Sequence, residues 1–209
     1  MEAPWYFDFV SPFAYLQLRR LDRLRARLAL TPVPVVLGAL FNQAGQRGPA
    51  EIPAKRTFTY RFVQWQAERA GIPLRFPPSH PFNPLAALRL CIAAGGGWPA
   101  VEAIYAHLWR DGGGADLADL APVAALLGID DIATAVAAPE VKMRLRANTE
   151  EAIAADVFGV PTVRLGDALF WGNDATAMIE EYLDDPQRFS GGEYARLDLL
   201  PFGIERRPA

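Results

Sequence analysis

The most constraining feature of the sequence is a short apolar run that leads directly into a helix-start signal. From Trp5 to Val10 every residue except Asp8 is aromatic or β-branched, which is typical of a strand buried on both faces of a parallel sheet. Ser11-Pro12 follows at once. Serine is a favoured N-cap and proline is favoured at the first helical position, so a helix is predicted to begin immediately after the strand.

The residues after Pro12 extend this beginning into a strand-helix-strand unit. Leucines at helical spacing predict an amphipathic helix that ends near Leu30. The valine-rich segment 31–40 predicts a second strand. Two strands joined through a helix of this size form a parallel pair with a right-handed crossover.

The middle of the chain predicts helices without strands. A loop rich in glycine and proline follows Phe41. The segments with helical spacing or cap signals are then 55–70, 85–94, 98–110, 117–127 and 141–155.

Strands return in the last third of the chain. Segments 162–165 and 169–171 predict a hairpin, and Asn173 or Asp174 can cap a final helix that runs to Leu183. The order βαβ, helices, ββα is that of a thioredoxin-like α/β fold interrupted by an all-helical insertion.

The two ends of the chain are predicted to form one discontinuous domain. We expect residues 1–44 and 157–209 to make the thioredoxin-like domain and residues 45–156 to make the insertion.

Composition excludes several classes of function. Among 209 residues, 21 basic side chains face 24 acidic ones without a basic run, which argues against nucleic acid or an anionic membrane as the main partner. One cysteine and two histidines provide neither a disulfide framework nor a zinc cluster. The first residues lack an export signal and no apolar stretch could span a membrane, so we expect a cytoplasmic protein with a small partner.

The segment Ser11-Pro12-Phe13-Ala14 stands where a redox thioredoxin-like protein carries its Cys-x-x-Cys. Both sulfur positions are empty, so the chain's own residues cannot perform thiol-disulfide exchange. A helix N-terminus stabilises an anion or a thiolate brought to it, and a serine hydroxyl adds a hydrogen bond. A plain N-cap would explain Ser11 equally well.

A second candidate element is Phe158-Gly159-Val160-Pro161-Thr162 at the start of a predicted strand. Val160-Pro161 is a candidate cis peptide bond. In thioredoxin-like proteins the residue before such a proline offers its backbone to an extended peptide, and Val160 would be that residue. The alternative is a proline that merely starts a strand.

These segments together resemble the 2-hydroxychromene-2-carboxylate isomerases and the kappa-class glutathione transferases. The resemblance extends to about Leu183, and its motifs are Tyr6–Leu16, Pro53–Arg56, Phe158–Thr162 and Phe170–Asp174. It implies a thioredoxin-like domain of the DsbA type with a helical insertion, which forms a homodimer and binds glutathione with the sulfur at Ser11.

The resemblance also implies which residues hold glutathione: Ser11, Pro12, Phe13, Gln46, Lys55, Val160, Asn173, Asp174 and Ala175. Val160 would pair with the cysteinyl backbone, and Lys55 could meet the glycyl carboxylate. The segment 173–175 would offer N–H groups to the γ-glutamyl carboxylate, with Asp174 taking the ammonium group. Gln46 stands where relatives usually carry asparagine. No metal ligands are expected.

The expected function is glutathione-dependent interconversion of 2-hydroxychromene-2-carboxylate and trans-o-hydroxybenzylidenepyruvate, with Ser11 as the catalytic residue. One alternative is a kappa-like transferase or peroxidase that consumes glutathione. Another is a module that binds glutathione or a peptide without chemistry. His80, His107 and Cys91 stand alone in the sequence and are interpreted as ordinary structural residues.

Overall fold

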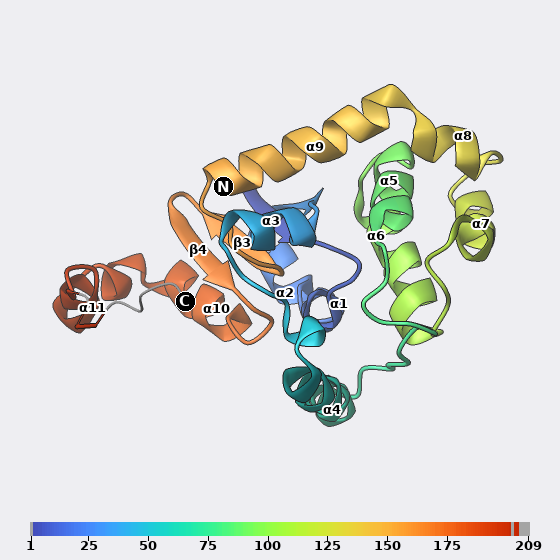
Figure 1. Ribbon diagram of the computed structural model, residues 1–209. Helices are drawn as coiled ribbons and strands as arrows, with labels where there is room; N and C mark the ends of the chain where they lie inside the picture. Colours follow the sequence, from blue (N-terminus) through green and yellow to red (C-terminus); the bar gives the residue numbers. More distant parts are fainter. Residues whose placement is uncertain (1, 202, 205–209) are drawn as a thin grey trace.

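A four-stranded sheet with the strand order β2-β1-β3-β4 forms the centre of the molecule (Figure 1). The structure is a computed structural model that describes residues 2–201 and 203–204. Strands β1 (Glu2–Phe7) and β2 (Ala29–Pro34) are parallel. Strand β3 (Thr162–Leu165) runs antiparallel to β1 and pairs with β4 (Ala168–Trp171) in a hairpin. The expected order βαβ…ββα is confirmed.

Strand β1 is buried on both faces, as its apolar run predicts. Trp5 and Phe7 point into the larger apolar cluster, which leucines of the first helices and aromatic residues of the insertion complete. Tyr6 lies between them in sequence and belongs to a second cluster on the opposite face. This alternation is the period of two that a strand imposes on its side chains.

The predicted bounds of the first two strands are wrong. The strand expected at Trp5–Val10 is displaced to Glu2–Phe7, and the strand expected over 31–40 ends at Pro34. Residues Leu37–Gln43 form helix α3 instead. Its first N–H groups are held by distant residues, because Leu37 N–H donates to the Asp8 carboxylate (2.8 Å) and Val36 N–H donates to Thr149 Oγ1 (3.1 Å). Because these hydrogen-bond acceptors lie far away in the sequence, no residue next to Leu37 indicates that a helix begins there.

The single helix expected to end near Leu30 is two helices, α1 (Pro12–Leu18) and α2 (Asp22–Arg25). Arg20 N–H and Leu21 N–H reach back only three residues, which closes α1. The buried leucines continue at helical spacing through the break, so the apolar pattern does not reveal it.

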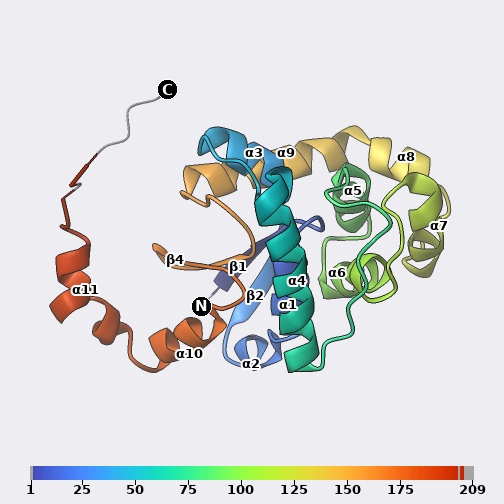
Figure 2. The same cartoon turned by 60° about the horizontal axis from the view of Figure 1, so that its bottom comes forward.

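Segment 45–156 is helical, as expected, and contains no strand within the described residues. The long helices α4 and α9 flank the sheet, and shorter helices form a bundle beside it (Figures 1 and 2). Their bounds are η1 Pro49–Glu51, α4 Pro53–Ala70, α5 Leu85–Ala93, α6 Trp98–Tyr105, η2 Ala106–Arg110, α7 Leu117–Leu126, α8 Ile132–Ala137 and α9 Pro139–Ala154.

The helical insertion and the sheet share one apolar core. Trp5 of β1 stacks on Trp98 and contacts Tyr105, both from α6 (ring centroids 5.6 and 6.5 Å apart). The division into domains 1–44 with 157–209 and 45–156 stays a prediction. Met1, Phe202 and residues 205–209 of that division lie outside the described residues.

The chain ends with α10 (Thr176–Asp184), η3 (Pro186–Phe189) and α11 (Gly192–Leu197). The expected cap at Asn173 or Asp174 is wrong, because α10 begins at Thr176 and has no side-chain cap. Helix α11 projects away from the sheet (Figures 1 and 2). Within the described residues, no helix combines the length and apolar composition needed to cross a bilayer.

Candidate active site

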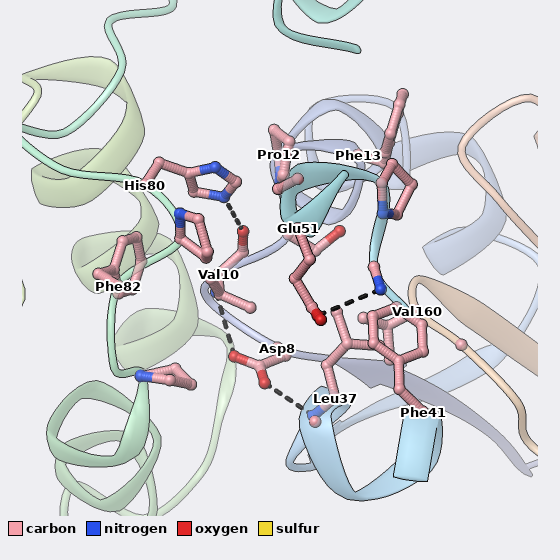
Figure 3. Close-up of a pocket in the computed structure, with 18 of the residues that line it drawn as sticks. Asp8, Val10, Pro12, Phe13, Leu37, Phe41, Glu51, His80, Phe82 and Val160 are labelled. Carbon is pink, nitrogen blue, oxygen red and sulfur yellow. Dashed lines mark hydrogen bonds between the residues drawn. The ribbon is translucent and has the colours of Figure 1, made fainter. Parts of the chain in front are cut away.

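A cavity of about 390 Å³ opens where strand β1 turns into helix α1. This volume lies in the range of small-molecule sites. Its wall combines the sheet with the insertion, and the lining residues are Asp8, Val10–Phe13, Val36–Gly38, Phe41, Gly48–Glu51, Thr59, His80–Leu85, Gly159, Val160 and Trp171 (Figure 3).

Ser11 lies at the N-terminus of α1 and is almost fully buried in the cavity wall. Its extended backbone is that of an N-cap, and its Oγ accepts a hydrogen bond from Ala14 N–H (3.3 Å). The hydroxyl proton is not used in that bond, so Ser11 keeps a donor for a ligand. The N-cap prediction is confirmed, and the same hydroxyl can serve both roles.

Val160 also lines the cavity, together with Pro12 and Phe13. The Val160-Pro161 peptide bond is cis, as the sequence predicts. The structure gives the N–H and C=O of Val160 no hydrogen-bond partner among the residues that it describes. A buried valine with both backbone groups unpaired is suited to an extended ligand.

The remaining predicted site residues lie outside the cavity lining. Gln46, Lys55 and Asp174 are exposed, and Ala175 is half-buried just before α10. Asn173 is buried, and its Nδ2 donates to Gln66 Oε1 of α4 (2.7 Å). The cavity therefore unites Ser11, Pro12, Phe13 and Val160.

The cavity wall also contains Asp8, to which the sequence interpretation gave no role, and His80, which it interpreted as an ordinary structural residue. Asp8 is fully buried, and burial raises its pKa to about 7, although two backbone N–H bonds oppose this rise. His80 is also buried, and burial lowers its pKa, which favours the neutral imidazole. A lone carboxylate inside an apolar strand run was a usable signal for Asp8, whereas His80 had none.

The polar groups of this cavity suit the chemistry of an anion or thiolate better than that of a metal. Among the described residues, no group of three or more histidine, cysteine or acidic side chains is placed to hold a metal ion. Ser11 supplies a hydroxyl donor, and the rings of Phe13, Phe41 and Phe82 supply an apolar wall. Such a site fits a small molecule with a flat apolar part.

Comparisons with known proteins agree with this fold. The family model of DsbA-like thioredoxin domains matches residues 4–184. A 2-hydroxychromene-2-carboxylate isomerase of Pseudomonas putida is 34% identical over 191 residues, which are 86% of this chain and 93% of that protein. Glutathione S-transferase kappa 2 of Caenorhabditis elegans is 24% identical over 206 residues, which are 87% of this chain and 91% of that protein.

A solved structure of 2-hydroxychromene-2-carboxylate isomerase superposes with a TM-score of 0.74 at 27% identity, and covers 96% of this chain and 100% of that chain. The expected thioredoxin-like fold of the DsbA type is thus confirmed. By its fold, its length and its sequence, the chain belongs to the DsbA-like thioredoxin family and, within it, to the 2-hydroxychromene-2-carboxylate isomerases.

Proposed function

We propose that the chain is a glutathione-dependent isomerase that interconverts 2-hydroxychromene-2-carboxylate and trans-o-hydroxybenzylidenepyruvate. The observation that carries this proposal is a single cavity lined both by Ser11, whose hydroxyl keeps a donor, and by Val160, whose backbone N–H and C=O have no partner within the described part of the chain. The relatives named as isomerases support the reaction class, and the kappa-class relative supports glutathione as the cofactor.

The residues of the cavity fit the central part of glutathione. The tripeptide presents an extended cysteinyl unit, which can pair with the N–H and C=O of Val160, since these groups bind none of the described residues. Ser11 accepts from Ala14 N–H, so its own O–H can donate to the sulfur. A hydrogen bond to the charged form of a thiol lowers its pKa, and Ser11 therefore favours the thiolate.

When bound, glutathione would supply a thiolate nucleophile for reversible addition to the conjugated side chain of the ring-opened substrate, so that the carbon–carbon double bond becomes single, can rotate, and is restored when the thiolate leaves. Ser11 stabilises the sulfur as an anion before addition and again after departure. Phe13, Phe41 and Phe82 hold the flat ring and exclude water from it. Glutathione is regenerated in each cycle and acts as a cofactor.

The ends of glutathione are assigned to residues around the cavity. Lys55, exposed in the first turn of α4, would meet the glycyl carboxylate, with Gln46 in the preceding loop as a further donor. The segment 173–175 before α10 would meet the γ-glutamyl carboxylate, and the exposed Asp174 would take its ammonium group.

The test compares the wild type with Ser11→Ala by titrating the thiolate absorbance of bound glutathione with pH. We expect the thiol pKa of bound glutathione to lie well below its free value in the wild type and to rise in the variant. Turnover of 2-hydroxychromene-2-carboxylate is then measured at saturating glutathione. A Ser11→Ala protein with unchanged turnover would refute the role of Ser11, and binding without turnover would show a glutathione-binding module.

The likeness to glutathione S-transferase kappa 2 favours a transferase as the second candidate. The same Ser11 site would then deliver the thiolate to an electrophile and consume glutathione. Product analysis separates the two: stoichiometric conjugation of an aryl halide, with chromene acids untouched, would replace the isomerase with the transferase.

A cytoplasmic location and a homodimer complete the proposal. Glutathione is the main thiol of the reducing cytosol, where the required cofactor is abundant. Light scattering of the purified chain tests the dimer, and a mass equal to one chain would refute it.

A further inference from the structure

Val10, the residue before Ser11, is held on both sides by titratable side chains. Its N–H donates to Asp8 Oδ1 (3.1 Å), and its C=O lies 2.8 Å from His80 Nε2 (Figure 3). These two bonds fix the peptide planes before and after Val10. The peptide plane after Val10 contains the backbone nitrogen of Ser11. The two hydrogen bonds therefore determine where the Ser11 hydroxyl lies.

Asp8 joins this turn to two other elements. Its Oδ2 accepts from Leu37 N–H at the start of α3 (2.8 Å). Its backbone C=O accepts from Ser11 N–H (3.0 Å) and from the Tyr105 hydroxyl of α6 (2.9 Å). The orientation of the turn thus depends on a carboxylate that is anchored in the rigid core.

His80 is itself fixed by helix α4. Its Nδ1 lies 2.6 Å from the Tyr60 hydroxyl, and its C=O accepts from Arg56 Nη2 (2.7 Å). The neutral tautomer with the proton on Nε2 satisfies both ring nitrogens, since it donates to Val10 C=O and accepts from Tyr60. His80 therefore connects the insertion to the residue beside Ser11.

We propose that Asp8 and His80 are positioning residues, which together hold the peptide groups of Val10 so that the Ser11 hydroxyl faces the sulfur of bound glutathione. This inference rests on the proposed function, because it needs a thiol at Ser11. Neither residue touches the reacting atoms in this role; both act through Val10.

The ionised form of Asp8 is the one that holds the turn, because a carboxylate accepts both N–H bonds more strongly than a carboxylic acid does. The titratable side chains around it are Tyr105 of α6 with Cys91 of α5 behind it, and His80 and Glu51 across the cavity. Burial of the carboxyl, and not a charged neighbour, is the cause that raises its pKa to about 7. Catalysis should weaken as the pH falls through that value.

The decisive measurement is the thiol pKa of bound glutathione in Asp8→Asn, because two explanations predict opposite signs. If Asp8 acted only through its charge, removing a nearby anion would lower the thiol pKa. If it positions Ser11, the thiol loses its hydrogen bond and its pKa rises. We expect a rise, together with a fall in kcat for 2-hydroxychromene-2-carboxylate of about tenfold and a change of KM for glutathione of less than about twofold.

His80 provides an independent pair of variants that leave net charge unchanged. His80→Gln keeps an N–H donor within reach of Val10 C=O and should retain most of the wild-type kcat and thiol pKa. His80→Leu removes the donor and should behave like Asp8→Asn. His107→Leu is the matched control on η2, where the ring contacts Gly114 C=O instead, and it should leave both quantities unchanged.

A double-mutant cycle with Ser11→Ala completes the test. If Asp8 and His80 act through Ser11, Asp8→Asn and His80→Leu should have little further effect in the Ser11→Ala background. Three results would each overturn the positioning role. The first is a lowered or unchanged thiol pKa in Asp8→Asn, and the second is an equal loss of kcat in His80→Gln and His80→Leu. The third is full additivity of the effects of these variants with that of Ser11→Ala. If Ser11→Ala itself leaves the thiol pKa unchanged, the proposed function fails and this inference fails with it.

Discussion

Replacing Asp8 by asparagine should change the pH dependence of stability in a direction set by its burial. Asp8 has a pKa of about 7 in the folded protein against 3.8 for an unperturbed carboxyl. A carboxyl whose pKa is higher in the folded protein stabilises the fold fully at pH values below its pKa in the unfolded chain. This stabilisation is lost as the pH rises through its pKa in the folded protein. From about pH 5 to about pH 8 the wild type should lose about 2.5 kcal/mol through this group.

Asparagine stays neutral throughout this range, so Asp8→Asn avoids that loss. The NH₂ group of the asparagine replaces a carboxylate oxygen that accepted a backbone N–H. The loss of this hydrogen bond costs about 1–3 kcal/mol of stability at every pH. The difference in unfolding free energy, variant minus wild type, should therefore increase by about 2.5 kcal/mol from about pH 5 to about pH 8. Burial lowers the pKa of His80, which acts in the opposite direction, but this contribution cancels in the difference.

Urea unfolding followed by circular dichroism at several pH values measures this difference. Asp130→Asn, at an exposed position between α7 and α8, is the matched control for the same replacement without burial. A flat difference for Asp8→Asn would refute the reasoning, because it would mean that Asp8 is already ionised at low pH in the folded protein.

Three further predictions follow from single contacts. Burial raises the pKa of the Cys91 thiol to about 12, so iodoacetamide should label the protein only after unfolding, and rapid labelling of the folded protein would contradict its burial. Gly71 ends α4 at φ +64° with open space around an added Cβ, so Gly71→Ala should cost about 1 kcal/mol through backbone strain alone, as measured by urea unfolding. Gln17 accepts from Trp5 Nε1 (2.7 Å) and donates to Gly172 C=O (2.9 Å), so Gln17→Leu should cost about 2–4 kcal/mol and lower Tm, and an unchanged Tm would contradict it.

The sequence predicts the fold well where the signals are local. The apolar run at Trp5, the Ser11-Pro12 helix start and the hairpin of segments 162–165 and 169–171 identify elements that the structure contains. Predictions failed where a distant residue determines the conformation. Leu37 begins a helix because Asp8 accepts its N–H, and valines before it suggest a strand when they are considered alone.

The candidate site divides in the same way. Ser11 and Val160 were predictable because each belongs to a short segment with its own conformational signature. Asp8 has only the signal of a lone carboxylate in an apolar run, and His80 has none, since their importance lies in two hydrogen bonds to Val10. A histidine 70 positions from its partner has no sequence pattern that marks it.

The bonds from the insertion to the first turn also determine when the site can form during folding. Tyr105 Oη and Trp109 Nε1 hold the carbonyl groups of Asp8 and Phe9 across 97 and 100 positions of chain. Val160 comes later still in the chain, just before β3. Contacts of such separation form slowly, because long loops must close first. A ribosome must therefore complete about three quarters of the chain before the residues around Ser11 can take their final places, and an N-terminal fragment that contains Ser11 alone should bind no glutathione.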